Sequence, residues 1–496
     1  MHTYCLLERL AAATIGYKED HNKHFQVAIQ NSEQHIIRIM EEFGAPGMAV
    51  AVSIDGVTVW KQDVVCSVTE WFVHLACYIP IGATTLLKRP WARYQQHLLL
   101  FSCLGFGYAD VENKVPCTPS SVMRVASISK SFTAMAAARL MEEGKLDLDK
   151  NIQEYVSFPE KFYEGKKVVI TLRQLLSNSS GIRHYHKTLS EARATSMLDI
   201  LNLPENNLTK QYESVTDALE IFQKDPLLFK PGEKYWYSTH GWTLVSAILE
   251  KVSGRDFLSL MQDNFHRLGM NETHADVHKK LIHNRSRYYI RKDGKLENAP
   301  YVNNSYKWAG AGFLSSVGDL IKFGNAMMYS FQLQNQKSSN SDLENNSSIP
   351  GILRADTVRE MWRSVILRKR GRGSKMPENI SYGLGWEVYP SMKWFGLCPK
   401  WQLEVAHSGL TCGASSILFL VPRRDSLHFS NQTLIPNGRN ISQIAHCFES
   451  DKTNAGNGIK GIAVAILTNI HGINLTSVAR DIANEFVEHS ADIFVP

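Results

Sequence analysis

The sequence predicts an α/β (α+β) fold in which a central antiparallel sheet is flanked by helices. Strand-like runs stand near both ends of the chain, at 48–60 and at 415–420 and 462–467, whereas 127 to about 400 follows a mainly helical pattern. Elements with one apolar face must pack against one another. We therefore expect strands from both chain ends to form one sheet, with the helical region inserted between them.

Length and composition indicate a large folded unit. The chain has 496 residues, of which 44% are hydrophobic and 21% are charged, so it can bury a sizeable core. At about 150 residues per domain the chain is long enough for three domains, but large α/β units often form a single domain. We expect one catalytic domain over 28–490, preceded at 1–27 by a leader or a remnant of a targeting segment. The net charge of +6 is small for this length and argues against a nucleic-acid partner.

The N-terminal elements follow from local pattern. Apolar residues return at helical spacing over 24–43, and the run Gly44-Ala-Pro-Gly47 ends that helix. A β-branched run at 48–54 predicts a strand, and Asp55-Gly56 predicts a hairpin turn into a return strand at 57–60. We expect a third strand near 106–108 to extend this meander.

Three segments do not match their surroundings. The stretch from about 63 to 103 is rich in Trp, Cys and Leu, and a structureless loop of that length inside a compact domain is uncommon. It is either a genuine insertion or a stretch absent from the mature message. Residues 64–87 are long enough to span a bilayer, but charged and proline residues within them argue against it, so membrane association is not predicted. The polar segments 334–349 and 423–458 predict surface loops.

The middle and C-terminal elements are mainly helices. Helical spacing predicts helices at 128–143, 214–224, 240–252 and 317–329, and a closing helix at about 475–489. The eight cysteines are scattered and form no C-x-x-C pair. We therefore expect no metal site, no cofactor and no disulfide framework.

The residues Ser127-Ile-Ser-Lys130 form the strongest local signal for chemistry. If a helix begins at or just before Ser127, the Lys130 amine lies beside the Ser127 hydroxyl, because residues three apart share a helix face. A serine hydroxyl is a weak nucleophile, and a lysine whose pKa is lowered by burial can activate it. The helix N-terminus adds N–H donors near a developing oxyanion. On its own, this tetrapeptide does not exclude a solvated surface lysine.

Four blocks together resemble the penicillin-binding-protein and class C β-lactamase family of serine hydrolases, in which Ser-x-x-Lys is a known motif. The blocks are Met123-Arg-Val-Ala-Ser127-Ile-Ser-Lys130-Ser-Phe-Thr133, Leu175-Leu176-Ser177-Asn178-Ser179-Ser180-Gly181-Ile182, Pro231-Gly232 followed by Tyr237-Ser238-Thr239, and His407-Ser408-Gly409. They correspond to the family's nucleophile helix, its Leu-Leu-x-His-x-Ser-Gly-Ile landmark, its Tyr-x-Asn block and its Lys-Thr-Gly strand. Asn178 stands where His is usual, and from its sequence setting we expect it to be a turn residue.

The resemblance covers about 30–62, 104–333 and 350–490 and implies a β-lactamase/transpeptidase-like fold. It implies that Ser127 attacks an amide or ester carbonyl and forms an acyl-enzyme. Lys130 and Tyr237 would share the role of general base. A tyrosine has an unperturbed pKa near 10, so Tyr237 would need an adjacent cation to act as phenolate, and Lys130 could supply it. The aromatic residues Tyr306 and Trp308 are assigned to packing rather than to the site.

The resemblance also implies four substrate-binding positions. Backbone N–H groups of Ser127 and Leu410 would form the oxyanion hole, and Gly409 would leave room for substrate along the strand edge. Thr239 offers one hydroxyl where the family has an amide. His407 replaces the family's strand cation and, with an unperturbed pKa near 6.5, is mostly neutral. We therefore expect peptide or ester substrates rather than efficient hydrolysis of β-lactams.

Further blocks, such as Gly107-Tyr-Ala-Asp-Val-Glu-Asn113, resemble an animal mitochondrial branch of the family. That resemblance implies a mitochondrial location, assembly of copies into filaments and an influence on lipid metabolism, although the targeting signal in this chain is weak. The expected function is a mitochondrial serine peptidase. The alternatives are a carboxylesterase or lactonase of the same fold, or a catalytically weak scaffold that forms filaments.

Overall fold

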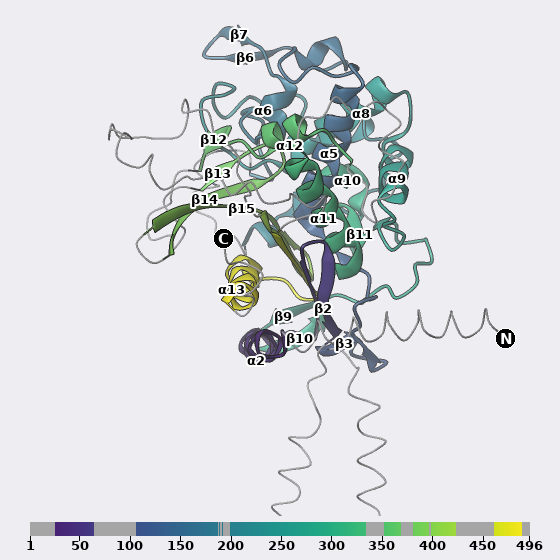
Figure 1. Cartoon of the computed structure of the whole chain (residues 1–496). Helices are drawn as coiled ribbons and strands as arrows, with labels where there is room; N and C mark the ends of the chain where they lie inside the picture. Colours follow the sequence, from purple (N-terminus) through teal and green to yellow (C-terminus); the bar gives the residue numbers. More distant parts are fainter. Residues whose placement is uncertain are drawn as a thin grey trace, which may run out of the picture.

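The computed structural model describes residues 25–63, 106–186, 188, 191, 199–333, 352–368, 380–395, 398–422 and 461–488 (Figure 1). The expected leader therefore falls almost wholly outside the described residues. The same holds for the atypical segment from about 63 to 103, apart from Asp63, and for the expected loops at 334–349 and 423–458. Within the described chain, no helix combines the length and the apolar character needed to cross a membrane.

A ten-stranded antiparallel sheet forms the centre of the described chain. Its order is β12-β13-β14-β15-β16-β17-β1-β3-β4, and β2 also pairs with β1. Strands from the two ends of the chain meet where β1 pairs with β17, so the predicted fold class is confirmed. The strands are β1 Gly47–Ile54, β2 Val57–Asp63, β3 Phe106–Asp110, β4 Val115–Pro116, β12 Ile366–Leu367, β13 Ser381–Tyr382, β14 Glu387–Phe395, β15 Cys398–Thr411, β16 Ala414–Pro422 and β17 Gly461–Thr468.

Each face of the sheet is covered by its own helices (Figure 1). Along β17 the side chains alternate, as they must in a strand: Ile462, Val464 and Ile466 join one apolar cluster, and Ala463, Ala465 and Leu467 the other. The first cluster includes α2 (Gln26–Phe43) and α13 (Leu475–Glu488), which contact each other. The second lies against α11 (Val317–Gln332) and the helical region.

The helical region is built from short elements around two longer helices. Its α-helices are α5 Ser129–Glu142, α6 Leu172–Leu176, α8 Thr239–Ser253, α9 Phe257–Arg267, α10 Trp308–Ala311 and α12 Ala355–Met361. Its 3₁₀ turns are η1 Ala126–Ile128, η2 Ile152–Glu154, η3 Asp199–Asn202, η4 Pro204–Asn206, η5 Asp217–Ile221 and η6 Asn304–Tyr306. Small sheets add β5 Met123–Arg124, β8 His274–Ala275 and β11 Phe313–Ser315, and the pairs β6 Lys161–Tyr163 with β7 Lys166–Val168 and β9 Tyr289–Lys292 with β10 Lys295–Asn298.

Most predicted elements are confirmed, and three expectations are wrong. The segment 214–224 contains only the 3₁₀ turn η5, not an α-helix. The helical pattern does not continue to residue 400, because β14 begins at Glu387. The helix expected at 128–143 is α5, and a 3₁₀ turn that begins just before Ser127 leads into it. The third strand does not extend a meander, because β3 pairs with β1 and not with β2.

Strands β2 and β3 both pair with β1, and their pairings follow one continuous register. Asp63, the last residue of β2, is paired with Ala49, and Phe106, the first residue of β3, is paired with the next residue, Met48. Phe106 therefore occupies the place that residue 64 would take in a continuous strand. Residues 64–105 interrupt one strand without changing its register.

We expect that deleting residues 64–105, which joins Asp63 to Phe106, leaves the fold intact, because the joined strand keeps every observed pairing. The thermal midpoint should stay within about one degree, which for a chain of this size corresponds to about 1 kcal/mol. Differential scanning calorimetry on both proteins measures it. The matched control deletes 64–106, which moves the register by one residue and removes the buried Phe106; it should destabilise the fold, since such a slip reverses the faces of a strand. Equal loss of stability in both deletions would contradict the expectation.

Candidate active site

Ser127 lies in a tight turn between the sheet and the helical region. It is in the 3₁₀ turn η1, directly before α5, and is only 8% exposed. The preceding residue, Ala126, has a φ of +47°, in the left-handed region that non-glycine residues seldom adopt. Strain of this kind is characteristic of functional sites. The turn presents the Ser127 hydroxyl to Lys130 and Tyr237.

Lys130 is wholly buried in the first turn of α5. Its Nζ lies 3.2 Å from Ser127 Oγ and donates a 2.6 Å hydrogen bond to the carbonyl oxygen of Gly310. Burial, and secondly the charge of Lys307, lower the pKa of Lys130 well below its ordinary value of 10.5. A neutral amine has a lone pair, so Lys130 can accept the proton of Ser127.

Tyr237 contacts the same oxygen. Its hydroxyl lies 2.5 Å from Ser127 Oγ, and the Lys130 amine lies 4.7 Å from the centre of its ring. Burial raises the pKa of Tyr237 well above 10. Burial therefore favours the neutral form of both groups, whereas we expected a phenolate beside a cationic Lys130. A phenol and an amine meet at one hydroxyl.

Thr239 begins α8 directly beyond Tyr237. Its backbone N–H donates to Nδ1 of His184 at 3.3 Å, and its side chain is buried. A Cβ added to Gly310 would lie 2.7 Å from the methyl carbon of Thr239 and 3.5 Å from the Lys130 amine. Thr239, Gly310 and Lys130 therefore lie together, as the predicted assignment of Thr239 to the site requires.

His407 is neutral and oriented by two hydrogen bonds. Its Nδ1 lies 2.8 Å from the carbonyl oxygen of Ser408, and because a carbonyl only accepts, Nδ1 carries the proton. Nε2 then accepts the hydroxyl proton of Tyr382 at 2.8 Å. Burial lowers the pKa of His407 to about 4. The ring therefore brings no cation to the site at neutral pH.

Gly409 permits the closest approach between β15 and the nucleophile turn. A Cβ at this position would lie 2.1 Å from Ser416 Oγ, 2.4 Å from the Val125 carbonyl oxygen and 3.0 Å from Ala126 Cβ. The sequence argument expected a side chain here to obstruct the substrate, whereas the atoms in its way belong to the protein itself. Leu410 follows on β15, beyond the part of that strand that pairs with β14.

Two residues that the sequence analysis did not assign complete the site. Gly310 supplies the carbonyl that fixes the Lys130 amine, and Lys307 is a second buried lysine whose Nζ donates to the Asn206 carbonyl at 2.6 Å. Burial and the charge of Arg124 lower the pKa of Lys307 to about 7. Both residues lie within two positions of Trp308, which was assigned to packing, and no pattern in Lys307-Trp308-Ala309-Gly310 marks them as site residues.

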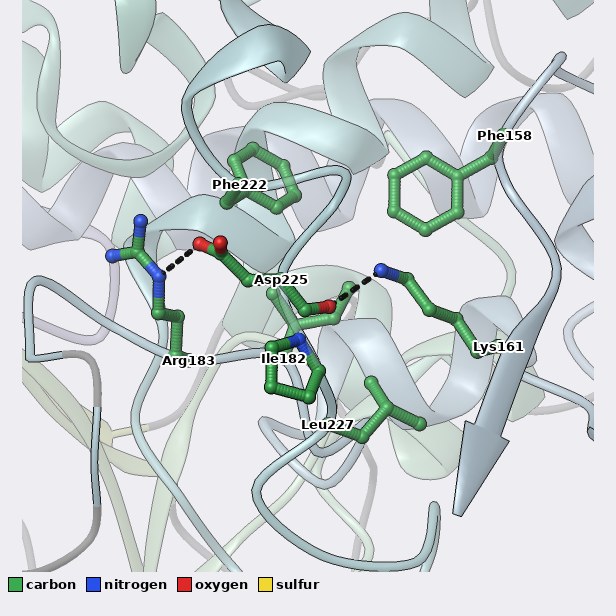
Figure 2. A pocket seen from close by; sticks show the side chains of 8 residues that line it. Phe158, Lys161, Ile182, Arg183, Phe222, Asp225 and Leu227 are labelled. Carbon is green, nitrogen blue, oxygen red and sulfur yellow. Dashed lines mark hydrogen bonds and ion pairs between the residues drawn. The ribbon is translucent and has the colours of Figure 1, made fainter. Parts of the chain in front are cut away.

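A small pocket elsewhere in the helical region has a structural explanation (Figure 2). Its charged groups are already paired: Arg183 forms an ion pair with Asp225, and Lys161 Nζ donates to the Asp225 carbonyl at 2.7 Å. The remaining lining is mostly apolar and includes Phe158, Phe222 and Leu227. These contacts brace the loop that carries Arg183 and leave no group of this pocket free for a ligand.

Comparisons with known proteins agree with this geometry. The family model described as Beta-lactamase matches residues 33–485. The human protein "Serine beta-lactamase-like protein LACTB, mitochondrial" is 35% identical and aligns with 94% of this chain and 81% of its own length.

Solved structures of distant relatives share the fold. The octameric penicillin-binding protein homologue from Pyrococcus abyssi has a TM-score of 0.60 at 23% identity and aligns over 93% of this chain and 77% of its own. EstCE1, a hydrolase with promiscuous acyltransferase activity, has a TM-score of 0.57 at 15% identity and aligns over 94% of this chain and 98% of its own. The match to the family model and the identity to the human protein confirm the predicted resemblance: this chain belongs to the Beta-lactamase family and has its serine-hydrolase fold.

Proposed function

We propose that this protein is a serine hydrolase that forms an acyl-enzyme on Ser127. One observation carries the proposal: Ser127 Oγ lies within hydrogen-bonding distance of both the Lys130 amine and the Tyr237 hydroxyl, in a nearly closed site. A nucleophile held by a neutral base is the arrangement that acyl transfer needs. A purely structural trio would have no need of a strained turn at Ala126.

In the proposed reaction, Ser127 Oγ attacks the substrate carbonyl carbon and its proton passes to Lys130. The N–H groups of Ser127 and Leu410 stabilise the oxyanion, a role worth about 3 to 4 kcal/mol per donor in other enzymes. Tyr237 protonates the leaving nitrogen or oxygen as its bond to carbon breaks, and the Lys130 ammonium restores the phenol proton. Water then attacks the acyl-enzyme through the same groups, which releases the acid and regenerates Ser127.

The proposed substrates are peptides. His407 provides no cation for a substrate carboxylate, because its pKa is about 4 and both ring nitrogens are occupied. Thr239 and Gly409 would shape the remainder of the binding site. Binding of a carboxylic ester or lactone likewise needs no cation from His407, so an esterase of the same mechanism is the second candidate. Faster turnover of esters than of every peptide tested would replace the first candidate by the second.

The cellular setting is proposed from relatives. The human relative is named as mitochondrial, and we propose the same compartment, with an influence on lipid metabolism and assembly of copies into filaments. The Pyrococcus homologue is described as octameric. Electron microscopy of the purified full chain, and its fractionation from cells, test assembly and compartment separately from catalysis.

The test of catalysis is labelling by a fluorophosphonate, which reacts covalently with activated serines. We expect the wild-type protein to be labelled and Ser127→Ala to lose the label. Ser131→Ala is the matched control: this serine lies four residues further along, is also buried, and donates a hydrogen bond to the Gly385 carbonyl instead of to the site. Equal labelling of wild type and Ser127→Ala, or none of the wild type, would overturn the proposal and leave the scaffold alternative.

A further inference from the structure

The loop that follows α6 holds the chain on both sides of Tyr237. The Trp236 N–H donates to the Asn178 carbonyl at 2.8 Å, and the Ser238 N–H lies 3.4 Å from Asn178 Oδ1. These two contacts flank the one residue whose hydroxyl must meet Ser127 Oγ. We propose that Asn178 is a positioning residue for Tyr237, an inference that rests on the proposed function of Tyr237.

The side chain of Asn178 is oriented for this role. Its Oδ1 accepts from Ser238 N–H and from Trp242 Nε1 at 3.2 Å, and both partners are donors only, so the opposite amide orientation would place N–H against N–H. Within the described chain its Nδ2 is buried without a hydrogen-bond partner. A buried, unpartnered amide group is unfavourable. The two hydrogen bonds that Oδ1 accepts offset this cost, and a smaller apolar side chain would make neither of them.

The same loop continues the attachment beyond Ser238. Ser238 Oγ donates to the Arg183 carbonyl at 2.6 Å, and Thr239 N–H donates to His184 Nδ1 at 3.3 Å. The His184 ring also meets the Tyr237 ring edge to face, with centroids 5.5 Å apart. The loop in turn is fixed by the Arg183 ion pairs with Asp225, drawn in Figure 2, and with Glu205.

The backbone explains why the position suits asparagine. Asn178 has a φ of +56°, in the left-handed region, where asparagine is among the few tolerated side chains besides glycine. Asn178→Gly therefore keeps the backbone conformation and the backbone carbonyl and removes the side chain with its Oδ1 acceptor. Asn178→Asp keeps an acceptor of the same shape. Comparing the two variants separates the effect of the side-chain acceptor from the effect of the backbone conformation.

The experiment measures the rate constant for acylation of Ser127 by a fluorophosphonate, together with thermal unfolding. We expect Asn178→Gly to slow acylation by about 10- to 100-fold, the loss associated with a displacement near 1 Å, and Asn178→Asp to restore most of it. Asn284→Gly is the matched control: Asn284 also has a φ of +56° but is exposed and outside the site. It should leave the rate unchanged.

A double-mutant cycle separates positioning from general destabilisation. In a Tyr237→Phe background, which lacks the hydroxyl that is positioned, Asn178→Gly should slow acylation no further, because the two changes act through one group. Hydrogen exchange at Ser238 should be faster in Asn178→Gly. An undiminished rate in Asn178→Gly, or an equal further loss in the Tyr237→Phe background, would overturn the inference. An unreactive wild type would instead overturn the proposed function.

Discussion

Replacing Lys130 with methionine is expected to slow acylation of Ser127 by about 10²- to 10⁴-fold, the range associated with loss of a general base. Methionine fills a similar volume, so it avoids the cavity that alanine would leave at this buried position. The Gly310 carbonyl loses its donor, but a buried amine no longer has to be desolvated. We expect the free energy of unfolding to change by no more than about 2 kcal/mol. Stopped-flow labelling and denaturant unfolding measure the two effects.

Lys307→Met is the matched control, because it removes a second buried lysine by the same substitution. The wild-type rate should rise as pH increases through the pKa of Lys130, since only the neutral amine accepts a proton. Loss of the neighbouring Lys307 charge raises the pKa of Lys130, because that charge lowers it in the wild type. The rise should therefore move to higher pH, with the plateau kept. Wild-type rates in Lys130→Met at every pH would exclude Lys130 as the base.

Gly409→Ala is expected to reduce both stability and acylation strongly. The new Cβ would lie 2.4 Å from the Val125 carbonyl oxygen, so β15 must move away from the turn that holds Ser127. Overpacking of this kind costs about 1 to 3 kcal/mol. Because Leu410 moves with β15, its N–H would no longer match that of Ser127, and loss of one oxyanion donor lowers rates by about 10²- to 10³-fold. Thermal unfolding and labelling kinetics give both values.

Two variants test this explanation. Ser416→Ala removes one obstructing atom, but the Val125 carbonyl remains, so Ser416→Ala should not rescue Gly409→Ala. Gly241→Ala adds a Cβ whose nearest neighbour is 3.6 Å away, and it should be well tolerated. If Gly409→Ala retained full stability and slowed only the turnover of bulky substrates, the original explanation, obstruction of the substrate, would be correct instead.

The elements predicted most accurately are those whose signals are local. Asp55-Gly56 adopts the positive φ values that a tight hairpin needs, and Gly44 ends α2 in the left-handed conformation. In the segment 214–224 the apolar residues at helical spacing are buried, but only a short 3₁₀ turn forms there. Short helices depend on tertiary contacts rather than on propensity.

Strand partners, and the contacts that Asn178 and Gly310 make with the site, could not be predicted from local signals. Strand β3 pairs with β1 although residues 64–105 separate it from the N-terminal hairpin in the sequence. The hydrophobic pattern of a strand does not specify which other strand it pairs with. Asn178 was assigned to a turn, correctly for its backbone, but its contacts with Trp236 and Ser238 join remote segments. The same is true of Gly310 and Lys130.

The sequence by itself determined that a serine hydroxyl and a lysine amine lie one helical turn apart, and that strands from both chain ends enclose a helical region. Only the tertiary structure decided the ionisation of these groups. Burial lowers the pKa of Lys130 and raises the pKa of Tyr237, and two hydrogen bonds fix His407 as one tautomer. Spacing along a chain follows from local geometry, whereas the pKa of a side chain depends on how much water the whole fold removes from around it.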